Sequence, residues 1–393
     1  MIISKNRFVL AALSPAILAL ASCGATASVD NGATVSSIHT TADAKIIGPF
    51  KVTEHGTFNE GWAGAFEPTT GRIFVTEKSG QLKFVNPETG QTGSVSGTPE
   101  VDYGGQGGFG DIAFAPDYAD SKMIYLSWVE AGDGETRGAV VGRGTLACES
   151  DAACSISDLD IIWRQTPKVT GRGHYSHRIV FSPDGQHLFV ASGDRQKMQP
   201  AQDTSNTLGT IVRLNLDGTP AAGNPMADKP APTNEIWSYG HRNILGLGFD
   251  AQGRLWDVEH GPAGGDEFNL VAAGSNYGWP LVSDGNHYDG KKIPNNSTRP
   301  DLAQSAITWT PVIAPGGMIF YGGDMFSDWK GTALIAGLSS NELVHVKIDG
   351  DGASEAARYG FENRLRAVVE APDGAIWVIE DGEGGRLLRL TPA

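Results

Sequence analysis

Short runs of alternating apolar and polar residues recur along the chain, each following a turn rich in Pro, Asp or Gly. In each unit an aromatic or apolar residue leads through such a turn into a run with high β-propensity. Alternation with a period of two, bounded by turn residues, predicts a β-hairpin. The six predicted hairpins span residues 66–76, 114–127, 181–191, 249–258, 320–336 and 370–379.

The spacing of these hairpins predicts the architecture. They follow one another at intervals of roughly 50 to 70 residues, and a repeat of that length is typical of a β-propeller. We therefore predict an all-β, six-bladed propeller over residues 46–393, with four antiparallel strands in each blade. No long helical periodicity follows residue 45, and a pair of β-sandwiches does not predict one hairpin motif repeated six times. In a propeller, the site residues come from loops of several blades.

The first 45 residues have a different pattern. Lys5 and Arg7 precede an apolar run at 8–21, which is too short to span a membrane and is typical of a secretory signal. The run ends in Leu-Ala-Ser-Cys23, which resembles the lipobox of bacterial lipoproteins and implies cleavage after residue 22 and acylation of Cys23. Residues 23–45 are rich in Ala, Ser, Thr and Gly and predict a flexible tether.

These features predict a periplasmic or cell-surface protein that is lipid-anchored to a bacterial membrane only through Cys23. An ordinary signal with an incidental cysteine is the alternative. In such an oxidising compartment, Cys148 and Cys154 on either side of a polar loop predict a small loop disulfide. A metal site there has less support, because no His or third Cys lies nearby at ligand spacing. The net charge of −15 argues against a nucleic-acid partner.

Two segments around the third hairpin suggest acid–base chemistry. His174 precedes one strand of the hairpin and Asp194 follows the other, so the hairpin brings both residues to one edge. A carboxylate beside an imidazole orients it as a general base. The alternatives are His177 as the base, or a histidine with a purely structural role. The glycine-rich segment at 104–111 carries Gln106, whose amide both donates and accepts hydrogen bonds.

Two further segments suggest binding of ions. Pro262, the glycines around it and Glu267 offer backbone carbonyls and a carboxylate, which are oxygen ligands that suit Ca²⁺. Arg364 and Arg366 are separated by one residue on a predicted strand, so they point to the same side. Together with Arg242 they offer guanidinium groups to carboxylates or phosphates. Salt bridges between blades are the alternative.

In this order, the segments resemble those of the soluble PQQ-dependent sugar dehydrogenases, also called aldose sugar dehydrogenases. The resemblance extends from about residue 46 to the end of the chain. It implies a six-bladed propeller that oxidises an aldose at the anomeric carbon to an aldonolactone. The resemblance also implies the cofactors PQQ and Ca²⁺, a small-molecule sugar substrate and an electron acceptor that the sequence does not identify.

The resemblance assigns a role to each matching position. His174 resembles the base and Asp194 its carboxylate partner, while Gln106 and Gln199 resemble substrate contacts. The cofactor-binding positions are Arg242, Asn243, Arg364 and Arg366. The backbone carbonyls of Gly261 and Pro262 resemble ligands of the calcium that holds PQQ. Glu267 and Tyr277 resemble ligands of a second, structural calcium.

Two positions depart from the family pattern. Ser339 stands where the family has a lysine that reaches the cofactor, and the loss of a charge-assisted contact costs about 1.5–3 kcal/mol of binding. Gly173 replaces a polar residue that some relatives carry before the base. Two other functions remain open at this level: a calcium-dependent lactonase-type hydrolase, or a non-catalytic binding propeller that has lost PQQ.

Overall fold

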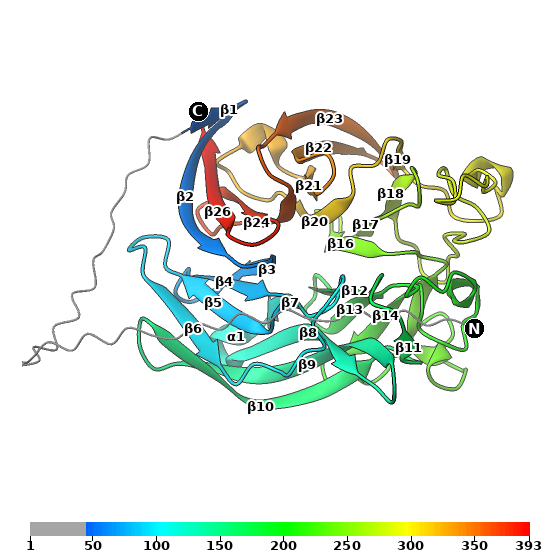
Figure 1. Cartoon of the computed structure of the whole chain (residues 1–393), viewed down its shortest axis with the longest axis horizontal. Helices are drawn as coiled ribbons and strands as arrows, with labels where there is room; N and C mark the ends of the chain where they lie inside the picture. Colours follow the sequence, from blue (N-terminus) through cyan, green and yellow to red (C-terminus); the bar gives the residue numbers. More distant parts are fainter. Residues whose placement is uncertain (1–44) are drawn as a thin grey trace, which may run out of the picture. The chain divides into compact units, whose positions relative to one another are not determined.

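A computed structural model describes residues 45–393, which fold into β-sheets with very little helix (Figure 1). The predicted signal at 1–22, Cys23 and the rest of the tether to residue 44 lie outside the described residues. None of the helices among residues 45–393 is long and apolar enough to cross a membrane. These helices are α1 (Tyr118–Ser121) and the 3-10 turns η1 (Gln199–Gln202), η2 (Thr233–Glu235), η3 (Asn296–Thr298) and η4 (Ser327–Trp329).

Three sheets have four antiparallel strands in chain order. The first contains β12 (Ser176–Phe181), β13 (His187–Ser192), β14 (Thr210–Asn215) and β15 (Ile236–Tyr239). The second contains β16 (Ile244–Phe249), β17 (Leu255–Glu259), β18 (Asp266–Leu270) and β19 (Ile307–Trp309). The third contains β20 (Pro315–Phe320), β21 (Ala333–Gly337), β22 (Glu342–Asp349) and β23 (Gly352–Gly360).

A nine-stranded sheet contains two further antiparallel units of four strands. One unit is β3 (Gly61–Phe66), β4 (Ile73–Glu77), β5 (Gln81–Val85) and β6 (Thr92–Ser96). The other is β7 (Phe109–Phe114), β8 (Met123–Ala131), β9 (Thr136–Cys148) and β10 (Ala153–Arg164). A parallel pairing of β6 with β10 joins the two units, and β11 (Val169–Thr170) pairs with β9. The described residues therefore form five hydrogen-bonded sheets rather than six separate ones.

The last sheet joins the two ends of the described chain. Its strands β24 (Leu365–Glu370), β25 (Ile376–Glu380) and β26 (Gly385–Pro392) come from the C-terminus. Antiparallel pairing with β26 adds the N-terminal strand β2 (Phe50–Phe58), and β1 (Lys45–Ile47) pairs with β2. The first strands of the six units, β3, β7, β12, β16, β20 and β24, contact one another in that order, and β24 contacts β3. In Figure 1 these strands surround a common centre.

The structure confirms the all-β fold and all six predicted hairpins, which are β3–β4, β7–β8, β12–β13, β16–β17, β20–β21 and β24–β25. It also explains why an aromatic residue recurs at the first turn. Each such ring packs on an aromatic ring from the second strand of the preceding unit, and edge-on contacts of this kind stabilise the interface. These pairs are Phe66–Trp377, Phe114–Phe74, Phe181–Tyr125, Phe249–Phe189 and Phe320–Trp256.

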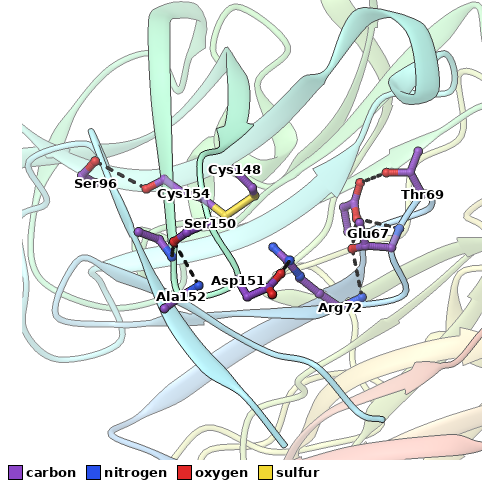
Figure 2. Close-up of a disulfide and its surroundings, with 11 residues drawn as sticks. Glu67, Thr69, Arg72, Ser96, Cys148, Ser150, Asp151, Ala152 and Cys154 are labelled. Carbon is purple, nitrogen blue, oxygen red and sulfur yellow. Dashed lines mark hydrogen bonds and ion pairs between the residues drawn. A yellow bond between two sulfur atoms is a disulfide. The ribbon is translucent and has the colours of Figure 1, made fainter. Parts of the chain in front are cut away.

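The predicted disulfide between Cys148 and Cys154 is present (Figure 2). The two cysteines are paired residues across the β9–β10 hairpin. Close by, Asp151 in the hairpin loop forms an ion pair with Arg72, with 2.7 Å between Oδ1 and Nη2. These contacts hold the tip of the long hairpin against the neighbouring unit.

Candidate functional site

Loops from all six units line one cavity of about 290 Å³. Most of its residues lie where the first strand of a unit begins or where the second strand ends, so the fold gathers positions that are far apart in sequence. The residues predicted from the sequence that line it are Gln106, Asn243, Arg364 and Arg366. Other lining residues are Glu60, Trp62, Lys78, Ser176, His177, His260, Leu338 and Asp381.

His174 and Asp194 lie together at one end of the β12–β13 hairpin. His174 Nδ1 is 2.7 Å from Asp194 Oδ1, and both side chains are buried. Asp194 also accepts hydrogen bonds from the Trp279 indole N–H at 2.7 Å and from two backbone N–H groups. The carboxylate therefore remains charged, and the contact with His174 keeps the Asp194 pKa below its usual range despite burial. Burial lowers the pKa of His174, so the imidazole is neutral at pH 7.

The backbone around His174 is strained. His174, Ser176 and His177 have φ angles of 50°, 57° and 56°, a region that non-glycine residues seldom adopt. Gln106 contributes to holding this conformation, because its Oε1 accepts a hydrogen bond from the His174 N–H at 2.7 Å. A side chain at Gly193 would clash with the His174 carbonyl oxygen, so only glycine allows the two segments to approach this closely.

Arg364 and Arg366 point to the same side, as their spacing predicts, and both contact Asp381. Arg364 Nε is 3.0 Å from Asp381 Oδ2, and Arg366 Nη2 is 2.8 Å from Asp381 Oδ1. The two guanidinium groups lower the pKa of Asp381. A third cation of the cavity wall, Lys78, lies 2.8 Å from Glu60 Oε1. The cavity is therefore lined by three cations and only two carboxylates. The excess positive charge is available to an anionic ligand.

Glu259, which the sequence analysis missed, positions Arg242 and Asn243. Its Oε2 accepts hydrogen bonds from the backbone N–H of Arg242 at 2.6 Å and of Asn243 at 3.2 Å. The Arg242 guanidinium donates to the His260 carbonyl at 3.1 Å, while its buried Nε has no hydrogen-bond partner. An unpartnered buried guanidinium nitrogen is costly, and this favours an acceptor supplied by a ligand.

The four predicted metal-binding residues line a second, smaller cavity of about 10 Å³. Gly261, Pro262, Glu267 and Tyr277 meet there with Glu259. The Tyr277 hydroxyl already donates to the Leu270 carbonyl at 2.6 Å and accepts from the Ala272 N–H at 2.9 Å. A metal ion near Tyr277 would therefore use its backbone oxygen.

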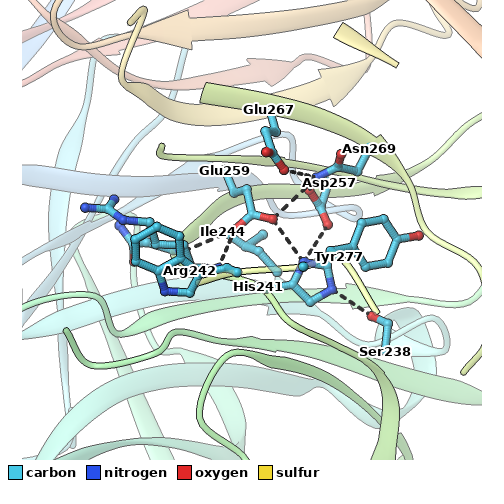
Figure 3. Close-up of polar contacts among 12 residues, drawn as sticks. Ser238, His241, Arg242, Ile244, Asp257, Glu259, Glu267, Asn269 and Tyr277 are labelled. Carbon is cyan, nitrogen blue, oxygen red and sulfur yellow. Dashed lines mark hydrogen bonds and ion pairs between the residues drawn. The ribbon is translucent and has the colours of Figure 1, made fainter. Parts of the chain in front are cut away.

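A cluster of buried carboxylates extends from this small cavity (Figure 3). Glu259 Oε1 and Asp257 Oδ2 lie 3.1 and 3.4 Å from His241 Nδ1, and Asp257 Oδ2 accepts no hydrogen bond. Asn269 donates to Asp257 Oδ1 at 3.1 Å. Burial and the charge of Glu259 raise the pKa of Asp257 and raise that of Glu267 to about 8. Arg242 is the cationic side chain that lines the small cavity, and a divalent cation there would further stabilise these carboxylates.

Two positions, Gln199 and Ser339, lie apart from the expected arrangement. Gln199 is exposed at the start of η1 and does not line the main cavity. The glutamine beside the base is instead Gln196, whose amide packs against Gly173 and whose N–H donates to Asp194 at 2.8 Å. Ser339 is exposed and donates to the Val312 carbonyl at 3.1 Å, while the preceding Leu338 lines the cavity.

His177 has a different environment from His174. It lies fully buried on Trp62, with ring centroids 4.8 Å apart, and its Nδ1 is 2.9 Å from the Ser127 hydroxyl. Burial, together with the charges of Arg178 and Arg195, lowers its pKa to about 3. Of the missed residues, Asp257 and Glu259 lie within β17 and Gln196 is the fourth residue after β13, and their partners are distant in sequence.

Comparisons with known proteins agree with this geometry. A family model described as Glucose / Sorbosone dehydrogenase matches residues 58–389. Aldose sugar dehydrogenase YliI of Escherichia coli (strain K12) is 36% identical over 336 residues, which cover 84% of this chain and 90% of that protein.

Solved structures give the same result. The crystal structure of the soluble aldose sugar dehydrogenase (Asd) from Escherichia coli in the apo-form superposes with a TM-score of 0.82 at 34% identity, covering 88% of this chain and 100% of that one. The PQQ-bound form of aldose sugar dehydrogenase (Adh) from Streptomyces coelicolor has a TM-score of 0.71 at 27% identity, covering 87% and 98%.

Proposed function

Because the chain belongs to the Glucose / Sorbosone dehydrogenase family, we propose that it oxidises aldoses at the anomeric carbon to aldonolactones with PQQ and calcium. The observation that carries the proposal is the pair formed by His174 and Asp194, which the hydrogen bond from His174 N–H to Gln106 joins to a cavity lined by cations. Related proteins described as aldose sugar dehydrogenases, one of them solved in a PQQ-bound form, support the choice of substrate and cofactor.

His174 acts as the general base in this proposal. Asp194 accepts a hydrogen bond from His174 Nδ1–H, so the Nε2 lone pair is free to take the proton of the anomeric hydroxyl. The imidazolium that forms is stabilised by the adjacent carboxylate, which Trp279 holds in place. A bound PQQ would supply the two-electron oxidant for the sugar carbon. Gln106 and Gln199 remain proposed substrate contacts, and Gln106 also holds the His174 backbone.

The described residues fit an anionic quinone. Arg364, Arg366 and Lys78 line the main cavity, and guanidinium groups recognise carboxylates in a bidentate manner. The Asn243 amide lines the same cavity, and Arg242, with its unpartnered Nε, lines the smaller cavity next to His260, which lines both. Ser339 stands where the family has a lysine. Lys78, which comes from another unit, supplies a cation to the main cavity.

The residues of the small cavity also fit calcium. We propose that the Gly261 and Pro262 carbonyls bind the ion that holds PQQ, and that Glu267 and the Tyr277 carbonyl bind a structural ion. Oxygen ligands of these kinds are those that Ca²⁺ prefers, and the hydrogen-bond-free Asp257 Oδ2 nearby indicates missing positive charge. When bound, calcium supplies Lewis-acid polarisation of the quinone.

Two wider features belong to the same proposal. We propose that the six four-stranded units are the blades of a six-bladed propeller, because their first strands contact one another in a closed ring. We also propose that Cys23 carries a lipid that anchors the protein to a bacterial membrane, in the periplasm or at the cell surface. Metabolic labelling with a radioactive fatty acid tests this, since a Cys23→Ser variant should lose the label.

Reconstitution tests the activity. Full-length protein with PQQ and Ca²⁺ should reduce an artificial electron acceptor when an aldose is added, and His174→Ala should lose this activity while binding PQQ normally in a spectroscopic titration. His187→Ala, at the far end of the same hairpin, is the matched control and should remain active. A Ser339→Lys variant measures what the missing lysine contributes to PQQ affinity.

Two different experimental results would contradict the proposed function. Failure to bind PQQ, together with no oxidation of any aldose, refutes the proposed function. Lactone hydrolysis in the absence of PQQ would favour a hydrolase instead.

A further inference from the structure

The exposed large apolar side chains within residues 45–393 gather around the candidate site. Those more than a third exposed are Tyr288 at 78%, Ile46 at 60%, Tyr103 at 50%, Leu281 at 40% and Met198 at 39%. Apart from Ile46 on β1, each lies on a loop bonded to a site residue. Tyr103 bonds to Glu60 of the cavity wall, and the Met198 N–H bonds to Asp194. Exposed apolar side chains on loops that hold site residues are candidates for ligand contacts.

Tyr288 is the most exposed of them and is joined directly to the site. Its hydroxyl accepts a hydrogen bond from Arg242 Nη2 at 3.3 Å, and the guanidinium carbon lies 5.9 Å from its ring centre. Arg242 also lies 5.1 Å from the ring of Trp279, which donates to Asp194. A continuous series of contacts therefore connects Asp194, the partner of His174, with an exposed tyrosine ring.

The loop that carries Tyr288 is well braced. Asn286 exchanges backbone hydrogen bonds with Ala263 at 2.9 and 3.2 Å, and the His287 N–H donates to the Lys291 carbonyl at 2.9 Å. Gly285 packs so closely on Gly264 and Pro262 that a side chain there would clash. The ring is therefore presented at the tip of a hairpin anchored to the segment that lines the small cavity, so binding on it requires little ordering.

We propose that Tyr288 binds the second ring of a disaccharide or longer oligosaccharide whose reducing end is oxidised at His174. This inference rests on the proposed function. An aromatic face complements the C–H-lined face of a pyranose, while the bond to Arg242 fixes the ring without covering it. The site is thus a binding subsite for neutral sugar rings beyond the reacting one, at the rim next to Trp279.

Steady-state kinetics of the PQQ- and calcium-loaded protein test the subsite. Glucose is compared with maltose and cellobiose in wild type, Tyr288→Ala, Tyr288→Phe and the control Ile46→Ala. The Tyr288→Ala variant should raise KM for at least one disaccharide about five-fold and change KM for glucose by less than about two-fold. Tyr288→Phe keeps the ring but loses the bond to Arg242, so it should retain most of the disaccharide binding, and Ile46→Ala should behave like wild type. Maltitol, which has no reducing end, should inhibit wild type more strongly than Tyr288→Ala.

Other results contradict the subsite. An unchanged ratio of disaccharide KM to glucose KM in Tyr288→Ala overturns it. Equal losses for glucose and disaccharides in both Tyr288→Ala and Tyr288→Phe also overturn it, because the tyrosine would then act through Arg242. In either case wild type still oxidises glucose, so the proposed function stands. Wild-type protein that oxidises no aldose overturns the proposed function and the subsite together.

Discussion

His174 combines three physical features that suit a base. Its backbone is strained, its imidazole is buried, and a charged carboxylate fixes its tautomer. A residue in the left-handed region costs about 1–3 kcal/mol, and such strain persists only where the surroundings over-determine it. Here Gln106 holds the His174 N–H, and the absence of a side chain at Gly193 leaves space for its carbonyl. The orientation of the base therefore depends on residues from two different units.

The variant Asp194→Asn tests the role of the carboxylate. Trp279 donates to Oδ2, so the asparagine oxygen should stay at the indole and its NH₂ group should face His174 Nδ1. The imidazole would then carry its proton on Nε2 and could not accept one from the sugar. We expect kcat to fall at least about 100-fold with unchanged PQQ affinity. Asp184→Asn, in the exposed turn of the same hairpin, is the control, and an Asp194→Asn protein with normal kcat would contradict this role.

The lowered pKa of His174 predicts the pH dependence of activity. A base must be unprotonated, so kcat/KM should fall only as the pH drops through the His174 pKa, which burial places below 6.5. We expect the acid limb of the profile below pH 6.5, measured with the loaded protein and a saturating electron acceptor. A limb centred above pH 7 would exclude His174 in this environment as the group that titrates.

At the scale of elements, the hairpin is the repeating unit of packing as well as of sequence. The aromatic residue before each turn packs between neighbouring units, which explains why Phe66, Phe114, Phe181, Phe249 and Phe320 recur at equivalent places. The β9–β10 hairpin departs from the pattern, because its strands are long enough for β10 to pair with β6 in parallel. That pairing covers the edge of the first unit, which would otherwise be open.

The disulfide stabilises this extended hairpin. Cys148 and Cys154 enclose a short loop, and the conformational entropy that the unfolded chain regains on reduction should lower the stability by about 2 kcal/mol. We expect the double variant Cys148→Ser/Cys154→Ser to unfold at lower denaturant concentration than the oxidised protein, with aldose oxidation retained. Reducing agent should have the same effect on wild type and none on the variant. Equal stability of the two oxidised proteins would contradict the prediction.

At the scale of the whole molecule, the two ends of the described chain meet in one sheet. β2 pairs with β26, so the sheet of the last unit is completed by the first long strand. The six first strands then contact one another in a ring, and the main cavity lies among residues at their beginnings and at the ends of their partners. A site built this way depends on ring closure, because each unit supplies only one or a few of its residues.

The global stability should depend on pH through His177. Its pKa is about 3 when folded and 6.5 in the unfolded chain, so between these values the unfolded state binds one more proton at this residue. Its contribution to stability is complete above about pH 6.5 and is lost as the pH falls, by up to about 1.4 kcal/mol per pH unit. Denaturant unfolding between pH 7 and 5 measures this loss together with that of His260, whose pKa burial also lowers to about 3. The His177 NMR resonance isolates this residue and should not titrate above pH 5. A midpoint near 6.5 would refute the prediction.

The sequence by itself determined the all-β class, the six hairpins, the loop disulfide and the pairing of His174 with Asp194. Each of these depends on short-range alternation, on turn residues or on a hairpin that joins its own ends. Only the tertiary structure decided that Glu259 holds the backbone of Arg242 and Asn243. It also decided that Gln196 rather than Gln199 lies beside the base. In the same way, Leu338 lines the main cavity and Ser339 does not. Those relations depend on which loops meet after the ring of first strands closes. Burial in the folded molecule also sets the charge of the carboxylates around His241, and no local sequence pattern encodes that burial.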